Sequence, residues 1–307
     1  MWIWLSPAPA AAGPPSTDDV VDPRVAKHRL VYENLLAARV APAGLVDRFQ
    51  IGYRRQLVQK PTPLWLDSQV SAKVDTSITP AYSAVGGNLE IQPLTVFRVG
   101  ARYQWISYFG TFGNVMSYPS PLRDYDRDRR QARVDAGENY VTSGHVVDLS
   151  ALLQAKAGPM IVRNELVWRY FALDLQPGDR VYYEQYLDVL VPNRGSALLL
   201  DTDVLAEIGR RWLVGARYSM VAPLYRDRHF EEGETVQNPN GPISRLGPAA
   251  LFRVFERPGA RFDAPSLVVI TQWHLRHRYR VGPSATTHPA VPTVIGGFLF
   301  EGTLWRR

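Results

Sequence analysis

Ser143 and His145 are the pair in this sequence whose types and spacing most directly allow catalysis. A histidine that takes the proton of a serine hydroxyl can activate that hydroxyl as a nucleophile against an ester. Positions two apart lie on the same face of a β-strand, so both side chains would point to one side. We recognise no third residue that would orient His145, and both residues equally suit polar positions at the end of a strand. We therefore favour a protein that is not an enzyme, with a lipid-active hydrolase using Ser143 and His145 as the alternative.

Charged side chains alternate with apolar ones over long stretches of the chain. Between Pro93 and Gly110 one parity is mostly apolar or aromatic, while Arg98 and Arg102 occupy the other parity. In a strand these two sets lie on opposite faces. The charged residues that we assign to the polar face, as candidate contacts for a solute, are Arg98, Arg102, Arg163, Glu165, Arg169, Asp201, Asp203, Glu207, Arg217, His274 and Arg276.

Two further motifs suggest a metal ion at first sight. His274 and His277 are three residues apart, so in a regular strand they face opposite sides and cannot share an ion without a bulge. Asp124, Asp126 and Asp128 have the spacing of the first ligands of a calcium loop, but the glycine and glutamate that should follow are missing. The chain has no cysteine, which excludes thiolate ligands. We predict neither a metal site nor a cofactor.

The elements that must position these side chains are β-strands, because period-two alternation continues from Leu45 almost to the end of the chain. The apolar parity slips near Ala84, which indicates either a bulge or two strands in that region. An alternative of twelve strands follows from this slip, with a further contribution from Tyr32 to Ala41. Our prediction is ten strands, at residues 45–58, 66–92, 95–109, 144–157, 160–172, 196–208, 211–223, 246–257, 265–279 and 291–305.

The connections and the polar face favour a membrane barrel over a soluble sandwich. Short turns such as 157–159 alternate with long polar loops such as 111–142 and 174–195. This asymmetry, with aromatic residues near the strand ends, is typical of transmembrane up-and-down antiparallel β-barrels. The polar face carries Arg, Asp, Glu and Gln interleaved with glycine, which suits a lumen. Because soluble sheets also alternate, a soluble barrel or sandwich that binds an apolar ligand is a further alternative.

On these features the sequence resembles bacterial outer-membrane β-barrel proteins in general, over about residues 45–305. The ending "GGFLFEGTLWRR" resembles the closing strand of that class, which finishes on an aromatic residue, although here two arginines follow Trp305. The resemblance implies a monomer in the bacterial outer membrane that contacts outer-membrane lipid and lipopolysaccharide and is inserted by the barrel-assembly machinery. Outer-membrane phospholipases and lipid A deacylases carry a lipid-facing histidine and serine two apart, but in the order opposite to Ser143 and His145.

The N-terminal part differs from the rest of the chain. Residues 1–21 pass from a short apolar piece through small residues to a polar stretch, which predicts a signal-peptide remnant or a disordered tail. Residues 22–44 have helix-forming composition, so we predict a short periplasmic segment there, helical or extended, before a barrel at 45–307. The net charge of +6 does not indicate nucleic-acid binding, because the arginines are dispersed and no recognition motif accompanies them.

The expected function follows from the expected lumen. Barrels of about eight strands are filled by side chains, and water-filled channels appear at about sixteen. Ten or twelve strands lie between these limits. We therefore predict a narrow channel or a structural barrel with a charged, partly filled lumen and long extracellular loops. The lumen would hold either a packed network of ion pairs or a conduit for a small polar or anionic solute.

Overall fold

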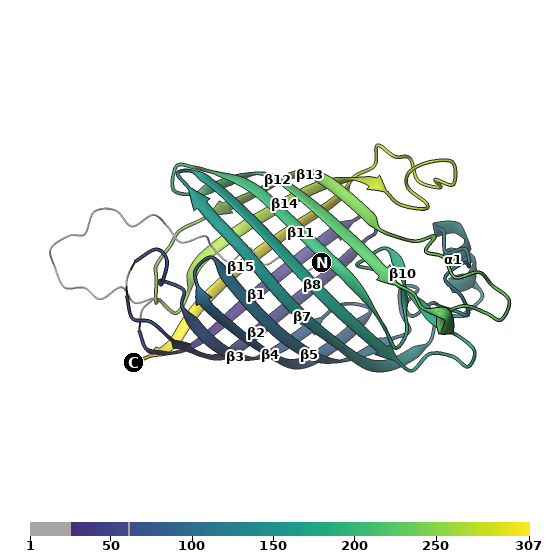
Figure 1. Ribbon diagram of the computed structural model, residues 1–307, viewed down its shortest axis with the longest axis horizontal. Helices are drawn as coiled ribbons and strands as arrows, with labels where there is room; N and C mark the ends of the chain where they lie inside the picture. Colours follow the sequence, from purple (N-terminus) through teal and green to yellow (C-terminus); the bar gives the residue numbers. More distant parts are fainter. Residues whose placement is uncertain (1–25, 61) are drawn as a thin grey trace.

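The computed structural model describes residues 26–60 and 62–307, so the prediction for residues 1–21 lies outside it. Twelve strands of the described chain form one closed antiparallel barrel, in which β1 pairs with both β2 and β15 (Figure 1). None of the helices in these residues is long and apolar enough to cross a membrane. The barrel strands are β1 (His28–Val40), β2 (Gly44–Gln56), β3 (Gln69–Ile78), β4 (Tyr82–Leu94), β5 (Phe97–Phe109), β7 (Val141–Ala157), β8 (Met160–Leu173), β11 (Gly195–Ile208), β12 (Trp212–Leu224), β13 (Ile243–Arg253), β14 (Asp263–Arg276) and β15 (Thr293–Arg306).

The predicted number of ten strands is wrong, because the closed barrel contains twelve. The region 66–92, expected as one strand, forms β3 and β4 with a turn at 79–81 between them. The other additional strand is β1, which falls in the segment 22–44 that we expected to precede the barrel. The barrel therefore begins at His28 and not at Leu45.

β1 was not predicted as a strand because apolar and polar residue types do not alternate along it. Leu30, Val31, Leu35 and Leu36 have a spacing that resembles one face of a helix. In the barrel Ala37 is buried and Leu36 is 47% exposed, so neighbouring side chains alternate between the inner and outer faces of the wall, as in any β-strand. Pairing of β1 with β15 closes the wall, so no strand of the barrel has a free edge. A free edge would expose unpaired backbone groups to lipid, which is strongly unfavourable.

The outer surface of the barrel carries large apolar side chains. On β5, Tyr103 and Trp105 are 49% and 42% exposed, whereas Arg102 is buried on the opposite face. Leu89 on β4 and Leu149 on β7 are exposed in the same way. Such residues on a closed barrel are stable against lipid, since the wall satisfies its own backbone groups. The architecture is therefore that of an outer-membrane β-barrel, and the alternative of a soluble protein with its apolar face inside is not supported.

The two ends of the barrel carry different connections. We call the end where β1 starts and β15 finishes the terminal end, and the opposite end the loop end. At the terminal end the connections are 57–68, 95–96, 158–159, 209–211 and 254–262. At the loop end they are 41–43, 79–81, 110–140, 174–194, 225–242 and 277–292. The long connections at the loop end carry α1 (Arg127–Asp135), η2 (Asp227–His229) and a small sheet of β6 (Ser117–Tyr118), β9 (Val181–Glu184) and β10 (Val189–Pro192).

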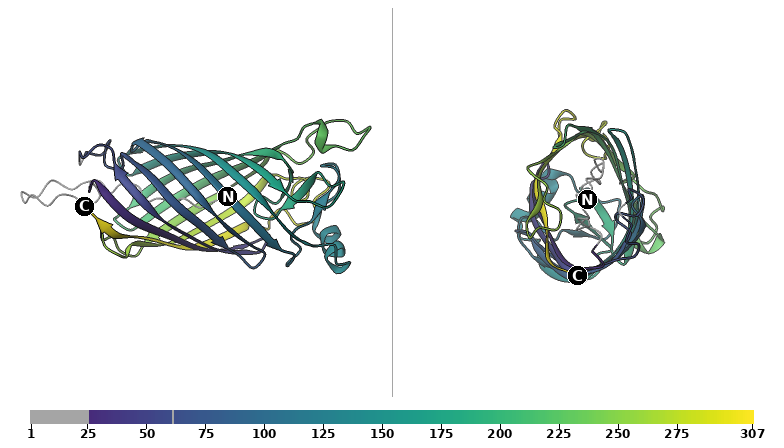
Figure 2. Two further views of the ribbon diagram at one scale, coloured as in Figure 1. Left: turned by 90° about the horizontal axis from the view of Figure 1, so that it is seen from below. Right: turned by 90° about the vertical axis from the view of Figure 1, so that its left-hand side faces the viewer.

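A hairpin fills the mouth of the barrel at the loop end. We call residues 181–192, which form β9, β10 and the turn between them, the plug hairpin. Leu187 and Val189 are 0% exposed and belong to an apolar cluster with inward-facing residues of the wall. The wall residues of this cluster come from six strands and are Tyr82, Ala84, Ile106, Tyr108, Phe171, Leu173, Ala197, Leu199, Val221 and Ile243. The hairpin therefore lies inside the closed ring that the strands form when seen end-on (Figure 2).

Candidate functional site in the barrel lumen

Five charged side chains meet in the middle of the lumen, and we call Arg48, Asp75, Arg102, Asp148 and Arg169 the central ionic cluster. Asp148 accepts two hydrogen bonds from Arg169, at 2.7 and 2.8 Å, and one from Arg102 at 2.7 Å. Asp75 accepts a hydrogen bond from Arg48 at 3.0 Å and lies 3.7 Å from Arg102. All five residues are buried. The cluster itself contains three guanidinium groups and two carboxylates, and Glu90, Glu165 and Asp201 line the cavity beside it.

Strand register assembles this cluster. Arg102 is the direct partner of Asp148 in the pairing of β5 with β7, and Asp148 is the direct partner of Arg169 in the pairing of β7 with β8. Opposite charges at directly opposed positions stabilise a strand pair. Inside the barrel these opposed Arg and Asp side chains also neutralise each other. This matters because a buried charge without a partner is strongly destabilising.

The other predicted lumen residues form smaller groups along the same wall. Glu165 lies 3.1 Å from Arg163 and 3.8 Å from Arg98. Asp203 accepts two hydrogen bonds from Arg217, at 2.6 and 2.7 Å. The structure thus places these residues in pairs or triads instead of one continuous row.

Asp201 and Glu207 also have polar partners. Asp201 accepts a hydrogen bond from Ser219 at 2.5 Å, and Glu207 forms an ion pair with Lys156. Both carboxylates are partly buried.

Several charged residues of the lumen were missing from the sequence-based site. Lys73 bridges Glu33 at 3.0 Å and Glu90 at 3.1 Å, and it is buried. Arg48 and Asp75 belong to the central ionic cluster described above. Four of these five residues fall on β2, β3 or β4, where polar parity alone could have identified them. Glu33 lies on β1, so it could not be assigned without recognising that strand.

His274 and Arg276 do not share one environment, contrary to the prediction. His274 pairs with Arg245 across β13 and β14, whereas Arg276 pairs with Ser244, so β14 contains one extra residue at this point. Arg276 is consequently exposed at the loop end and not buried in the lumen. The rings of His274 and His277 are both buried, and their centroids are 5.1 Å apart. The expectation that these two histidines face opposite sides is wrong because of this bulge.

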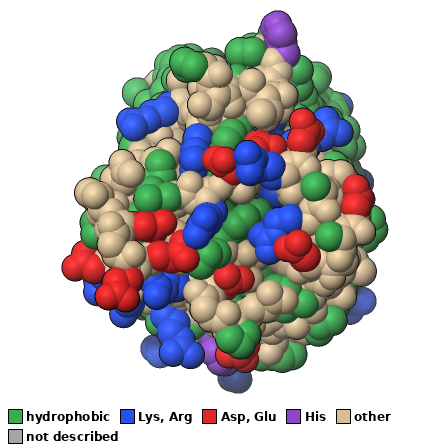
Figure 3. Space-filling view, turned by 90° about the vertical axis from the view of Figure 1, so that its right-hand side faces the viewer, with side chains coloured by type: hydrophobic (Ala, Val, Ile, Leu, Met, Phe, Trp, Pro, Cys, Tyr) green, Lys and Arg blue, Asp and Glu red, His purple; other side chains and the backbone are tan. Residues whose placement is uncertain are grey.

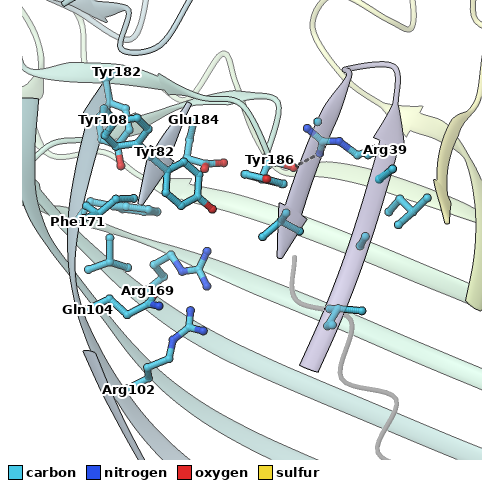
Figure 4. A pocket seen from close by; sticks show the side chains of 18 residues that line it. Arg39, Tyr82, Arg102, Gln104, Tyr108, Arg169, Phe171, Tyr182, Glu184 and Tyr186 are labelled. Atoms are coloured by element: carbon cyan, nitrogen blue, oxygen red, sulfur yellow. Dashed lines mark hydrogen bonds between the residues drawn. The ribbon is translucent and has the colours of Figure 1, made fainter. Parts of the chain in front are cut away.

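Arg39, near the end of β1, holds the tip of the plug hairpin. Its guanidinium donates to the backbone carbonyl of Tyr186 at 2.6 Å (Figure 4). It also donates to the backbone carbonyl of Gln185 at 2.7 Å. The Tyr186 ring lies 5.1 Å from the guanidinium and 6.0 Å from the Tyr82 ring, which it meets edge-on. Charge-assisted hydrogen bonds of this kind are about twice as strong as neutral ones. The tip is therefore fastened to the first strand of the wall.

Asp188 forms a second attachment of the plug hairpin. Its carboxylate accepts hydrogen bonds from the Tyr183 hydroxyl and from Arg280 Nε, both at 2.6 Å, and lies 3.5 Å from His277 Nε2. Burial alone would raise the pKa of Asp188, but His277, Arg280 and Tyr183 hold this pKa well below its usual range. Burial lowers the pKa of His277 below its usual value.

Three cavities follow one another inside the barrel. The largest, about 980 Å³, lies at the loop end, and we call it the vestibule. Basic and acidic side chains are mixed around the centre of this face (Figure 3). A chamber of about 70 Å³ lies beneath the plug hairpin, between a group of aromatic rings and the guanidinium groups of Arg102 and Arg169 (Figure 4). A third cavity of about 60 Å³ lies at the central ionic cluster.

The cavities are separated by side chains of the wall and the plug hairpin. Tyr82, Tyr108 and Glu184 line both the vestibule and the chamber, so they form the partition between them. Arg102 and Arg169 likewise separate the chamber from the third cavity. The two smaller cavities have room for a few water molecules. In the part of the chain that the structure describes, these side chains therefore lie between neighbouring cavities of the lumen.

Ser143 and His145 lie on the lipid-facing side of β7 but do not form a catalytic pair. His145 Nδ1 is 2.8 Å from the Tyr103 hydroxyl, and the two rings stack with centroids 5.7 Å apart. Across β5 and β7, His145 opposes Trp105 and Ser143 opposes Ser107. The imidazole is engaged by the tyrosine of the neighbouring strand and not by the serine. This geometry gives the hydrolase alternative no support.

Comparisons with known proteins give low sequence identities and low TM-scores. No protein-family model matches the chain, and no curated protein matches it. The β domain of the Bordetella autotransporter Brka is similar over 89% of this chain and 99% of its own, at 10% identity and a TM-score of 0.42. The NanC porin is similar over 89% and 100%, at 9% identity and a TM-score of 0.39. Omp33 of Acinetobacter baumannii is similar over 91% and 98%, at 9% identity and a TM-score of 0.36.

Proposed function

We propose that this protein is a narrow outer-membrane channel in its closed state, with the plug hairpin as its gate. The observation that carries the proposal is the position of the hairpin, which separates a vestibule of about 980 Å³ from a charged lumen. The vestibule at the loop end, whose lining includes charged side chains such as Arg130 and Arg280, gives a solute access to the gate from outside. The apolar outer surface and the even number of strands support a location in the bacterial outer membrane. Lipopolysaccharide, the barrel-assembly machinery and a monomeric state stay predictions.

The solute that we propose is small and polar or anionic. The central ionic cluster has three guanidinium groups against two carboxylates, and Glu165 lies within ion-pair distance of both Arg98 and Arg163. A constriction with fixed positive charge favours anions over cations. The group around Arg217 has the opposite sign, since Asp201 and Asp203 both lie near it. Selectivity would therefore arise at the central ionic cluster.

The attachment of the plug hairpin supports its role as a gate. β9 and β10 pair with each other, and β9 pairs with β6 of another loop, so no backbone ladder joins the hairpin to the wall. Its displacement would break side-chain contacts, such as those of Arg39 and Asp188, and leave all barrel pairings intact. Order–disorder changes of a loop segment are a common form of gating.

Conductance in planar bilayers tests the proposal. The wild-type chain is compared with a variant in which residues 181–192 are replaced by a short Gly-Ser linker. We expect rare openings in the wild type and sustained current in the variant, with a reversal potential in a salt gradient that indicates anion preference. Deletion of the exposed residues 235–237 in a different loop is the matched control and should leave the barrel closed. A variant that is folded but silent would contradict the channel and favour a structural barrel.

A further inference from the structure

Three side chains of metal-ligand type meet where the plug hairpin contacts the end of β14. Asp188, His274 and His277 each offer one ligand atom, these atoms all lie within 4.8 Å of one another, and all three residues are buried. Two imidazoles and one carboxylate are the protein ligands of many three-ligand zinc sites, which keep a fourth position for water.

His274 supplies a second, independent observation. The residue is 7% exposed, and within the described chain its Nε2 atom has no hydrogen-bond partner. Buried polar atoms in folded proteins nearly always have a partner, so each exception requires an explanation. A buried imidazole with a nitrogen that has no partner, close to a carboxylate and a second imidazole, has the chemistry of a metal ligand.

The local chain geometry explains why these groups converge. The extra residue in β14 brings the His274 ring to 5.1 Å from the His277 ring, which a regular strand would not allow. Asp188 comes from the turn between β9 and β10, far away in the sequence. The cluster thus contains groups from both the plug hairpin and the barrel wall.

We propose that Asp188, His274 and His277 bind one divalent transition-metal ion of the zinc type, which fastens the plug hairpin to β14. Imidazole ligands suit zinc, nickel and copper, whereas calcium and magnesium prefer sites made of oxygen atoms alone. Zinc bonds of about 2.0–2.2 Å place tetrahedral ligands roughly 3.4 Å apart, so these side chains need shifts of about 1 Å to close around an ion. Asp188 and His277 line the vestibule, which gives the ion a path from the loop end.

Existing hydrogen bonds of Asp188 and His277 compete with the ion. Arg280 Nε donates to Asp188 Oδ2 at 2.6 Å, although a carboxylate oxygen can accept a further partner. His277 Nε2 lies 2.9 Å from the Asp188 carbonyl, and His277 Nδ1 accepts from the Tyr279 backbone N–H at 3.0 Å. His277 must exchange these contacts to bind, so His274 and Asp188 should contribute more to affinity. Replacement of the competing cation, Arg280→Gln, should strengthen binding.

Calorimetric titration of the full-length folded barrel in detergent with zinc chloride tests the site. We expect one ion per chain in the wild type and at least about tenfold weaker binding in His274→Ala and Asp188→Asn. His145→Ala is the matched control, because His145 is exposed on the lipid-facing side, and it should bind as the wild type does. Calcium chloride should produce no binding. Asp188→Asn preserves side-chain shape and carries the test if His274→Ala does not fold.

Protection of the plug from a protease gives a second measurement. Zinc should slow cleavage within residues 174–194 of the wild type by at least about tenfold and have no effect on His274→Ala. The proposal is overturned if the wild type does not bind one zinc ion, or if His274→Ala and Asp188→Asn bind zinc as tightly as the wild type. Neither measurement uses conductance. A barrel that binds zinc but never conducts would therefore contradict the channel alone.

Discussion

The substitution Asp148→Asn tests whether the central ionic cluster is shielded from water. Asp148 is 6% exposed and accepts three hydrogen bonds, two from Arg169 and one from Arg102. The substitution removes from Arg169 the carboxylate that accepts two of its hydrogen bonds, whereas Arg102 keeps Asp75 at 3.7 Å. Removal of one partner from a buried ion pair costs about 3–5 kcal/mol, and the second partner of Arg102 places our expectation near the lower value, at about 3 kcal/mol.

The assay is urea-induced unfolding from lipid vesicles, followed by the fluorescence of the 8 tryptophans. The double variant Asp148→Asn with Arg169→Gln should recover part of the loss, because it removes the guanidinium that has lost the two hydrogen bonds to Asp148. Glu232→Gln, which changes an exposed loop acid, should shift the free energy of unfolding by no more than about 0.5 kcal/mol. A loss below about 1 kcal/mol in Asp148→Asn would refute the reasoning, since it would mean that water screens the cluster.

Three further predictions concern the plug hairpin and the lipid-facing surface. Arg39→Ala removes charge-assisted hydrogen bonds to two carbonyls. The free energy of local opening of residues 174–194, measured by proteolysis, should therefore fall by about 1.5–3 kcal/mol. Acidification should also release the hairpin. Folding lowers the pKa of both His277 and Asp188, so the stability that each group contributes is lost as the pH falls below its usual pKa. For His277 this loss begins below pH 6.5, and for Asp188 below pH 3.8. Protease protection measured as a function of pH tests this. Leu89→Arg, in the middle of β4, should cost about 2–4 kcal/mol in vesicles, against at most about 1 kcal/mol for Val40→Arg at the rim, by urea-induced unfolding.

Period-two alternation was sufficient to predict the greater part of the wall. The strand predicted at 95–109 is observed as Phe97–Phe109, with Arg98 and Arg102 buried. Alternation succeeded there because lipid selects apolar residues on one face of each strand and the lumen selects polar residues on the other. β1 does not show this pattern by residue type, so its assignment depends on the pairing with β15 that closes the barrel.

The plug hairpin could not be placed from the sequence, although the sequence contained an indication of it. The stretch "VYYEQYLDVLVP" lies in a loop that we expected to be polar, yet it is rich in aromatic and branched residues. Such a stretch predicts burial, but it does not say which surface buries it. The convergence of His274 and His277 was hidden for a different reason, because it depends on one extra residue in β14 that no pattern of residue types announces.

Current through a barrel whose plug hairpin can be locked tests the central claim most directly. The chain has no cysteine, and Gln185 Nε2 donates to the Ala43 carbonyl at 2.8 Å, so Ala43→Cys with Gln185→Cys places two thiols between wall and hairpin. In planar bilayers, we predict openings before cross-linking with a short bifunctional thiol reagent and none after it. Openings that persist unchanged after complete cross-linking would contradict the hairpin as the gate.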